Sequence, residues 1–150
     1  MAHRTTYVMQ STIAHPKHMI EGFIRGLKAR RPALFNLYSS CQPEHGIGDD
    51  ASMRQAKLAV ESRAFPLFTY DPRRGESLAE RLSLTGNPAV KDDWAKTPDG
   101  QKIDFLAFAR TEGRFAPHFG ADGTPSVEIQ ATQLDRLANW RTLQELAGIR

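Results

Sequence analysis

The strongest constraint on the fold is an alternation of strand-like and helix-like segments in the first half of the chain. The strand-like segments are 5–12, 33–38 and 65–71, and the helix-like segments between them are 15–30 and 49–64. The former are short and rich in β-branched or aromatic residues, as strands are. This order is typical of parallel βαβ units, in which helices cover both faces of a sheet. We therefore predict an α/β fold with a partial parallel sheet and flanking helices.

The first helix-like segment carries its apolar residues at helical spacing. Pro16 suits the first turn of a helix because its missing N–H would have no partner there, and Pro32 ends the segment. The apolar face consists of Ile20, Phe23, Ile24 and Leu27. Three parallel strands form a small sheet that needs neighbours at both edges. The pattern therefore indicates a missing part, which is another chain, another copy or an upstream segment.

The second half of the chain has a different character. Residues 72–102 combine prolines and charges with spaced apolar residues, which predicts an ordered wrap that includes a short helix at 77–84. Further helices are predicted at 102–115 and 125–148, and the last of these forms a helical C-terminal extension. Core or interface residues in this half are Trp94, Trp140, Phe105, Phe108 and Phe115.

Composition limits the functional classes. The net charge of +3 is spread along the chain without a long basic run, so a nucleic-acid partner is not expected. No apolar stretch reaches the roughly 20 residues that span a bilayer, so a membrane is not expected either. A single cysteine cannot form an internal disulfide, and the N-terminus has no signal peptide. We expect a cytoplasmic protein.

The loop at residues 39–50, SSCQPEHGIGDD, contains most of the candidate chemistry. Residues 46–51, from Gly46 to Ala51, match a Gly-x-Gly-x-x-Ala phosphate loop, and Asp71 follows at the distance of a ribose-binding acid. The loop is long for a dinucleotide fingerprint, and Asp49 and Asp50 would repel a pyrophosphate. We interpret these two aspartates as residues that cap and begin the following helix. A free-standing α/β module that binds a nucleotide or a partner through this loop remains the alternative.

Cys41 admits three further interpretations. His45 could act as its base and Asp49 could orient the imidazole, although catalytic triads are usually assembled from distant segments. An inert buried cysteine is the commoner case. The loop lacks the Cys or His pairs of zinc sites, and one cysteine cannot hold an iron–sulfur cluster by itself. His15 and His18 are interpreted as surface histidines, and no role is assigned to His118.

The central block of the sequence resembles a known family. The block runs from LFNLYSSCQPEHGI through QAKLAVES to FPLFTYDPR. It is similar to the C-terminal part of the thiamine-diphosphate-binding domain of pyruvate:ferredoxin (flavodoxin) oxidoreductases and related 2-oxoacid:acceptor oxidoreductases. The matching residues are Tyr38, Ser39, Cys41, His45, Gly46, Ile47, residues 55–60, Ser62, residues 66–68 and residues 70–73.

The resemblance implies a role for Cys41. It is expected to be one ligand of a 4Fe-4S cluster whose other ligands lie outside this chain, and no residue is assigned a catalytic role. Three residues separate Cys41 from His45, one more than in the family, so the role of His45 stays open. The family's Gly-Asp-Gly motif for the diphosphate and Mg²⁺ is absent from this sequence.

The chain is therefore expected to be the C-terminal segment of a larger enzyme that decarboxylates a pyruvate-like 2-oxoacid oxidatively. Residues 1–72 would belong to the thiamine-diphosphate-binding α/β domain, and residues 73–150 would form its C-terminal wrap and helices. The resemblance implies thiamine diphosphate with Mg²⁺ and a 4Fe-4S cluster in the complete enzyme, none of them bound tightly by this chain alone. The implied partners are the remainder of the oxidoreductase, a ferredoxin or flavodoxin acceptor, and a second copy in a homodimer. A structural or interaction domain without a site of its own is the remaining alternative.

Overall fold

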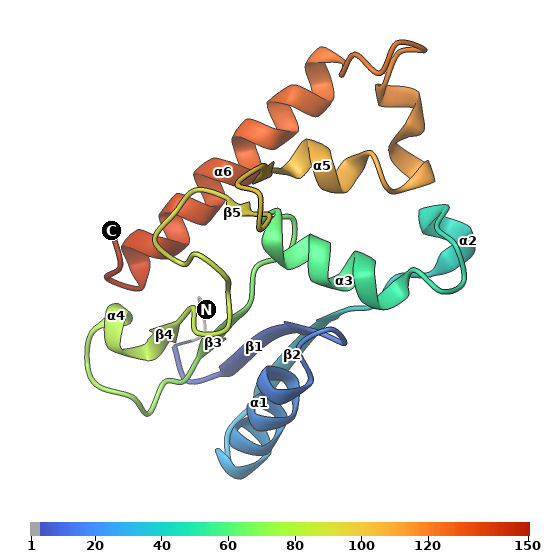
Figure 1. Cartoon of the computed structure of the whole chain (residues 1–150). Helices are drawn as coiled ribbons and strands as arrows, with labels where there is room; N and C mark the ends of the chain where they lie inside the picture. The colour runs from blue at the N-terminus through green and yellow to red at the C-terminus, as the bar shows by residue number, and fades with distance from the viewer. Residues whose placement is uncertain (1–3) are drawn as a thin grey trace.

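A computed structural model describes residues 4–150 of the chain (Figure 1). Its elements are β1 (Tyr7–Thr12), α1 (Pro16–Lys28), β2 (Ala33–Tyr38), α2 (Gln42–His45), α3 (Ser52–Glu61), β3 (Phe68–Tyr70), α4 (Leu78–Arg81), β4 (Leu82–Ser83), β5 (Ala95–Lys96), β6 (Lys102–Ile103), α5 (Phe105–Ala109), the 3-10 helix η1 (Gly113–His118) and α6 (Val127–Leu146). The α/β class and the long C-terminal helix are confirmed. Among the described residues, no helix is both long and apolar enough to cross a membrane.

The main sheet is mixed, with the strand order β2-β1-β3-β4. β1 and β2 are parallel over their full lengths, but β3 runs antiparallel to β1 and β4 antiparallel to β3. The prediction of three parallel strands was therefore wrong for the third. The direction follows from α3, which packs beside α5 instead of crossing back over the sheet (Figure 1). The chain re-enters the sheet beside the end of β1, where Phe68 pairs with Gln10, so β3 must run backwards.

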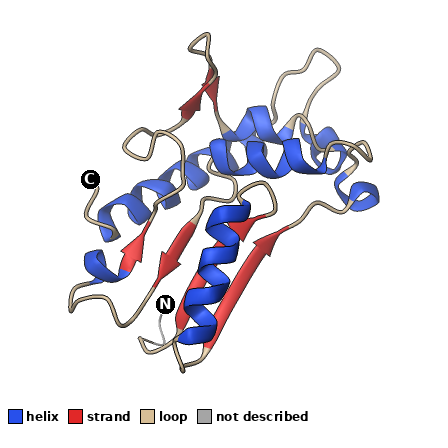
Figure 2. Ribbon diagram, turned by 60° about the horizontal axis from the view of Figure 1, so that its bottom comes forward, coloured by secondary structure: helices blue, strands red, loops and turns tan. Residues whose placement is uncertain are grey.

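Both faces of the central strand β1 are covered. Tyr7 and Met9 face α1, which lies across one face of the sheet (Figure 2). Val8 packs on the other face in a cluster that includes Leu143 and Leu146 of α6. Nearly every residue of β1 is therefore buried, because α1 and α6 lie on opposite sides of the strand.

Two glycines set how α1 sits on the sheet. A Cβ at Gly22 would lie 2.7 Å from Cγ of Met9, and a Cβ at Gly26 would lie 2.6 Å from the ring of Phe35. Both distances are shorter than real Cβ contacts, so only glycine permits this close approach. The helix therefore turns a glycine face toward the sheet, and much of its apolar face points elsewhere.

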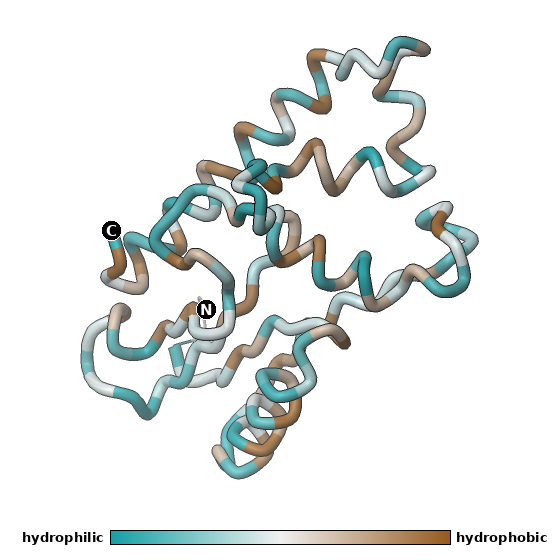
Figure 3. Tube along the Cα trace, in the orientation of Figure 1, coloured by the Kyte–Doolittle hydropathy of each residue, from teal (hydrophilic) through white to brown (hydrophobic). Residues whose placement is uncertain are grey.

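The predicted apolar face of α1 is divided between the core and the solvent. Phe23 packs against Phe35 of β2 in a tilted arrangement, with ring centroids 4.6 Å apart. Ile20, Ile24 and Leu27 are exposed. Hydrophobic segments accordingly recur along the turns of α1 in Figure 3.

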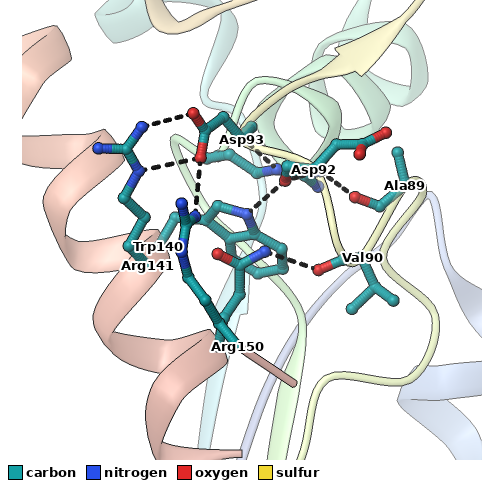
Figure 4. Close-up of polar contacts among 9 residues, drawn as sticks. Ala89, Val90, Asp92, Asp93, Trp140, Arg141 and Arg150 are labelled. Atoms are coloured by element: carbon teal, nitrogen blue, oxygen red, sulfur yellow. Dashed lines mark hydrogen bonds and ion pairs between the residues drawn. The ribbon is translucent and has the colours of Figure 1, made fainter. Parts of the chain in front are cut away.

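The segment after β4 is ordered by contacts to α6, as predicted for the wrap (Figure 4). The indole Nε1 of Trp140 donates to the carbonyl oxygen of Asp92 at 2.9 Å. Arg141 forms a two-pronged ion pair with the carboxylate of Asp93, which Arg150 also contacts. These hydrogen bonds from Arg141 hold the pKa of Asp93 below its ordinary value.

Arg63 also holds the segment after β4 in place. Its side chain is buried and donates to the backbone carbonyl oxygens of Pro88, Ala89, Asp92 and Asp93. Its guanidinium also lies over the ring of Trp140, 4.2 Å from the centroid. Burial lowers the pKa of Arg63 to about 10. The charged stretch between β4 and β5, which has no helix or strand of its own, is therefore held in place by polar contacts.

The helix predicted at 102–115 is wrong in extent. Asp104 accepts a hydrogen bond from the backbone N–H of Ala107 and so caps α5, which leaves Lys102 and Ile103 to pair with β5. α5 ends at Ala109, and a separate 3-10 helix follows from Gly113. The short helix predicted at 77–84 is confirmed in its first part, where Ser77 and Glu80 form a capping box.

Candidate functional site

Cys41 lies at the end of β2, where the chain leaves the sheet. Two residues separate it from the strand, and it is the N-cap residue of α2. Its carbonyl oxygen accepts a hydrogen bond from the backbone N–H of His45 at 2.9 Å. The side chain is a free, exposed thiol, so the interpretation as a buried inert cysteine was wrong. The position leaves the thiol accessible to groups outside this chain.

The donor set around Cys41 is small. Within residues 4–150, no cluster of three or more histidine, cysteine, aspartate or glutamate side chains could hold a metal ion. A 4Fe-4S cluster usually takes four cysteine ligands. This chain can therefore contribute to such a cluster but does not by itself supply a complete ligand set.

The imidazole of His45 is directed at a glutamate from a distant segment. Its Nδ1 lies 3.7 Å from Oε1 of Glu112, and its ring stacks on Tyr38 with centroids 5.9 Å apart. Among the described residues, no ion pair joins His45 to Asp49. The geometry therefore does not provide the Cys-His-Asp arrangement considered for a nucleophile.

Glu112 is buried and is the centre of a polar network, which we call the Glu112 network and which consists of Tyr38, His45, Gln55, Glu112 and Arg114. The hydroxyl of Tyr38 donates to Oε1 at 2.7 Å, and Nε2 of Gln55 donates to the same oxygen at 3.0 Å. Nε of Arg114 donates to Oε2. Burial raises the pKa of Tyr38, and its hydrogen bond to Glu112 raises that pKa further.

The Glu112 network joins the segment between β2 and α3 to a segment that is remote in the sequence. Tyr38 ends β2, His45 ends α2, Gln55 lies in α3, and Glu112 and Arg114 flank the start of η1. A buried carboxylate must find partners because its desolvation is costly. The network therefore fixes the loop that carries Cys41 against the α5–η1 segment.

Gly46 makes a close backbone contact with Gly113. Its φ of +61° is a left-handed conformation, and its carbonyl oxygen accepts a hydrogen bond from the N–H of Gly113 at 3.3 Å. A Cβ at Gly46 would lie 2.8 Å from Cα of Gly113. This glycine thus serves the contact between α2 and η1.

The two aspartates of the loop do not begin α3. The helix starts at Ser52, its N-cap residue is Ala51, and its first turn contains no acidic residue. Asp49 and Asp50 are exposed and precede the N-cap, so their interpretation as helix-capping acids was wrong. A turn in which the N–H of Ala51 donates to the carbonyl of Gly48 separates them from the helix.

Asp71, the acid that would bind a ribose in the nucleotide hypothesis, lies at the opposite end of the sheet from the glycine loop. Because β3 is antiparallel, Asp71 follows the pair Val8–Tyr70 near the start of β1, whereas residues 46–51 follow the end of β2. Asp71 instead accepts two hydrogen bonds from the guanidinium of Arg73, which hold the pKa of Asp71 below its ordinary value. The structure does not bring the glycine loop and this acid together.

The histidines before and within α1 are half-buried and bound to hydroxyl groups. Nδ1 of His15 lies 3.0 Å from Oγ1 of Thr12, and Nδ1 of His18 lies 2.9 Å from Oγ of Ser11. Burial lowers the pKa of both histidines. They are structural residues at the end of β1.

An apolar cavity of about 400 Å³ adjoins the Glu112 network. It is lined by Leu37, Tyr38, Ser39, His45, Ala64, Phe65, Phe105, Phe108, Arg114, Phe115, Thr132 and Arg136. The aromatic residues predicted for the core thus form part of its wall. The cavity lies beside the edge strand β2 and close to the loop with Cys41.

Sequence reasoning missed the residues that hold the Cys41 loop. Glu112 and Arg114 lie far from Tyr38 in the sequence, and Gln55 was noted only as a residue that matches the family. Glu112 is surrounded by charged and small residues in ARTEGRFA, which resembles an exposed turn. Only the long-range packing of η1 on α2 makes this glutamate a buried partner of Tyr38.

Three curated proteins illustrate what the chain is similar to. The "Ketoisovalerate oxidoreductase subunit VorB" of Pyrococcus horikoshii is 31% identical over 149 residues, which is 99% of this chain and 41% of that protein. The "Pyruvate-flavodoxin oxidoreductase" of Rhodospirillum rubrum is 31% identical over 79% of this chain and 9% of its own length. The "Pyruvate:ferredoxin oxidoreductase" of Moorella thermoacetica is 33% identical over 71% of this chain and 8% of its own length.

These similarities cover most of the chain but only part of each relative. The chain spans less than half the length of the curated relatives described here. No family model matches the sequence. At about 31% identity over most of its length, the chain is thus homologous to subunits or segments of 2-oxoacid and pyruvate oxidoreductases.

Proposed function

We propose that this chain is the C-terminal segment of a thiamine-diphosphate-dependent, iron–sulfur 2-oxoacid:acceptor oxidoreductase. The complete enzyme would decarboxylate a pyruvate-like 2-oxoacid oxidatively and pass the electrons to a ferredoxin or flavodoxin. The isolated chain is expected to be inactive. The names of the relatives supply the substrate and acceptor classes.

The observation that carries the proposal is the position of Cys41. It is a free, exposed cysteine just beyond the end of β2, inside the block that matches the family. A side chain held at the end of a strand has a defined position relative to the sheet. This makes Cys41 a suitable single ligand of a 4Fe-4S cluster, and the other ligands would come from elsewhere in the enzyme.

This chain can supply only some of the residues that would hold the implied cofactors. One thiol is available where a 4Fe-4S cluster takes four, and the described residues contain no larger ligand group. When bound in the complete enzyme, thiamine diphosphate supplies the carbanion chemistry and the cluster accepts single electrons. The part played by this chain is to hold Cys41 in place through α2 and the Glu112 network.

The same proposal includes partners and location. The remainder of the oxidoreductase would be the obligate partner, and the complete enzyme would be a cytoplasmic homodimer. Residues 1–72 would complete the thiamine-diphosphate-binding domain, while residues 73–150 would form its C-terminal wrap. No part of this chain is proposed to grip the diphosphate.

Reconstitution of the isolated chain tests the proposal. The purified chain is incubated with iron and sulfide under reducing, anaerobic conditions, and iron content, visible absorbance and electron paramagnetic resonance are recorded. We expect no stable 4Fe-4S signal, because three of the four ligands would be missing. A stoichiometric cluster on the isolated chain would contradict the idea that it is a segment of a shared site.

A further inference from the structure

Most of the exposed large hydrophobic side chains of the described residues lie on α1 and β2. We call this area the α1–β2 surface and define it by five side chains, which are Ile20, Ile24, Leu27, Leu34 and Leu37. Among the described residues, nine large hydrophobic side chains are exposed, and these five are the majority of them. Each is between 40% and 73% exposed. Singly exposed apolar residues are ordinary, but a cluster of this kind marks an interaction site.

The helical part of the α1–β2 surface is continuous with the strand. Phe23 packs on Phe35 of β2, which fixes the side of α1 that faces this strand. Ile20 and Leu27 lie three residues before and four residues after Phe23, so they flank it on the helix surface. Ile24 follows Ile20 at the next helical turn. The apolar stripe therefore begins at β2 and extends outward over α1.

The strand part exposes both of its faces. Leu34 pairs with Val8, whose side chain points to the α6 side, and Leu37 pairs with Ser11 on the side of α1. Both leucines are nevertheless exposed, because α6 covers β1 but leaves Leu34 uncovered, and α1 leaves Leu37 largely uncovered. A partner that buries them must cover β2 from both faces.

The backbone edge of β2 is also open. β2 is the terminal strand in the order β2-β1-β3-β4, and within residues 4–150 it pairs with β1 alone. Proteins usually protect such an edge with a charge, a proline or a bulge. The strand ALFNLY contains no charged residue and no proline, and its register with β1 is unbroken. The opposite edge strand, β4, is only two residues long.

We propose that the α1–β2 surface is the docking surface for the remainder of the oxidoreductase, which adds a strand to the free edge of β2 and covers both of its faces. This inference rests on the proposed function. The occupant is chosen because more than half of the Pyrococcus horikoshii relative lies outside the segment that matches this chain. A continued sheet with helices on both faces satisfies the edge backbone, Leu34 and Leu37 together.

Complex formation between this chain and the rest of the same organism's 2-oxoacid oxidoreductase, expressed as a separate polypeptide, tests the inference. The variants Ile24→Glu and Leu34→Glu place a charge in the α1–β2 surface. The matched control is Leu134→Glu, which changes an exposed leucine of α6 that is 68% accessible. Affinity is measured by titration, and amide hydrogen exchange of β2 is followed in the free chain and in the complex.

We expect each surface variant to weaken binding about tenfold or more, because apolar anchors dominate interfaces. The control is expected to bind like the unchanged chain, and the amides of β2 are expected to become protected in the complex. Unchanged binding of both variants, or unprotected β2 amides in the complex, would overturn the inference. So would self-association of the chain that Leu34→Glu abolishes while the other polypeptide does not bind.

The test separates this inference from the proposed function. If the partner binds elsewhere while Cys41 still supports the cluster of the assembled enzyme, only the docking surface is wrong. If the partner binds at the α1–β2 surface while the cluster survives loss of Cys41, the surface stands and the assignment of Cys41 is wrong.

Discussion

The wrap against α6 and the α1–β2 surface differ in the environment of their side chains. Arg63 and Trp140, whose side chains contact the wrap, are buried, and each donates to a backbone carbonyl oxygen of the wrap. On the α1–β2 surface, Leu34 and Ile24 are exposed and have no comparable cover. The first region makes its main contacts within residues 4–150, and the second is the surface that we propose a partner covers. From the sequence alone, the polar wrap would be expected to face solvent, and the apolar residues of α1 and β2 would be expected to be buried.

This difference predicts which contacts stabilise the isolated chain. Contacts in the wrap are made whenever the chain is folded, so changes there should lower stability directly. Side chains of the α1–β2 surface are already exposed in the isolated chain, so changes there should leave its stability almost unaffected. The following predictions test this division, from the largest effect to the smallest.

Trp140→Ala should cause the largest loss of stability. The indole is 1% exposed, donates to Asp92 and lies under the guanidinium of Arg63. Removal of such a buried aromatic side chain typically costs about 3–5 kcal/mol. Urea unfolding followed by circular dichroism measures the change. Leu134→Ala on the same helix is the control and should stay within about 0.5 kcal/mol, since that side chain is exposed.

Glu112→Gln should have an intermediate effect. The change removes the charge that pairs with Arg114 and disturbs the hydrogen bonds from Tyr38 and Gln55. A broken buried hydrogen bond to a charged group costs about 1–3 kcal/mol. Hydrogen exchange should quicken at the amides of His45 and Ile47, because their loop loses its anchor.

Glu44→Gln is the matched control for this prediction, since Glu44 is an exposed residue of the same short helix. It should change neither the unfolding free energy nor exchange at the loop. Equal behaviour of the two variants would show that the Glu112 network does not hold the Cys41 loop.

Acidification should lower the free energy of unfolding through protonation of His15 and His18. Burial lowers the pKa of both residues below the ordinary value of about 6.5, so the unfolded chain binds protons at higher pH than the folded chain does. Their contribution is complete above that value and is lost as the pH falls from there toward the lower native pKa values. Urea unfolding at several pH values between 7.5 and 5 measures this loss.

The double variant His15→Gln/His18→Gln should show a smaller decrease of the unfolding free energy over the same pH range. A decrease identical to that of the unchanged chain would mean that other groups cause the acid sensitivity.

The smallest effect on the isolated chain is expected for polar substitutions on the α1–β2 surface. Ile24→Lys and Leu34→Thr should alter the unfolding free energy of the isolated chain by less than about 0.5 kcal/mol, because both side chains are already exposed. A loss comparable to that of Trp140→Ala would contradict the proposed contrast between the two regions.

Local patterns in the sequence were sufficient for most element positions. Pro16 and Pro32 bracket α1 as expected, and the strand ALFNLY has the predicted bounds. The direction of β3 was not predictable, because it depends on α3 packing on α5 instead of crossing the sheet. The apolar spacing in α1 was recognised, but two glycines turn a different face to the sheet. Periodicity indicates which residues share a face and does not say what that face contacts.

The site was predictable only in part. The end of a strand is a position that can be inferred from the sequence, and Cys41 lies there. Its ligand role was inferred from resemblance and stays a prediction. Glu112 could not be inferred, since its partners Tyr38 and Gln55 become neighbours only after the whole chain has folded. Long-range polar contacts of this kind leave no local signal.

Substitution of Cys41 in the complete oxidoreductase tests the central claim most directly. Cys41→Ala should abolish or destabilise one 4Fe-4S cluster, measured by iron content and electron paramagnetic resonance, while thiamine diphosphate remains bound. The account predicts the loss of that one signal with the cofactor retained. Survival of every cluster in the variant would contradict it.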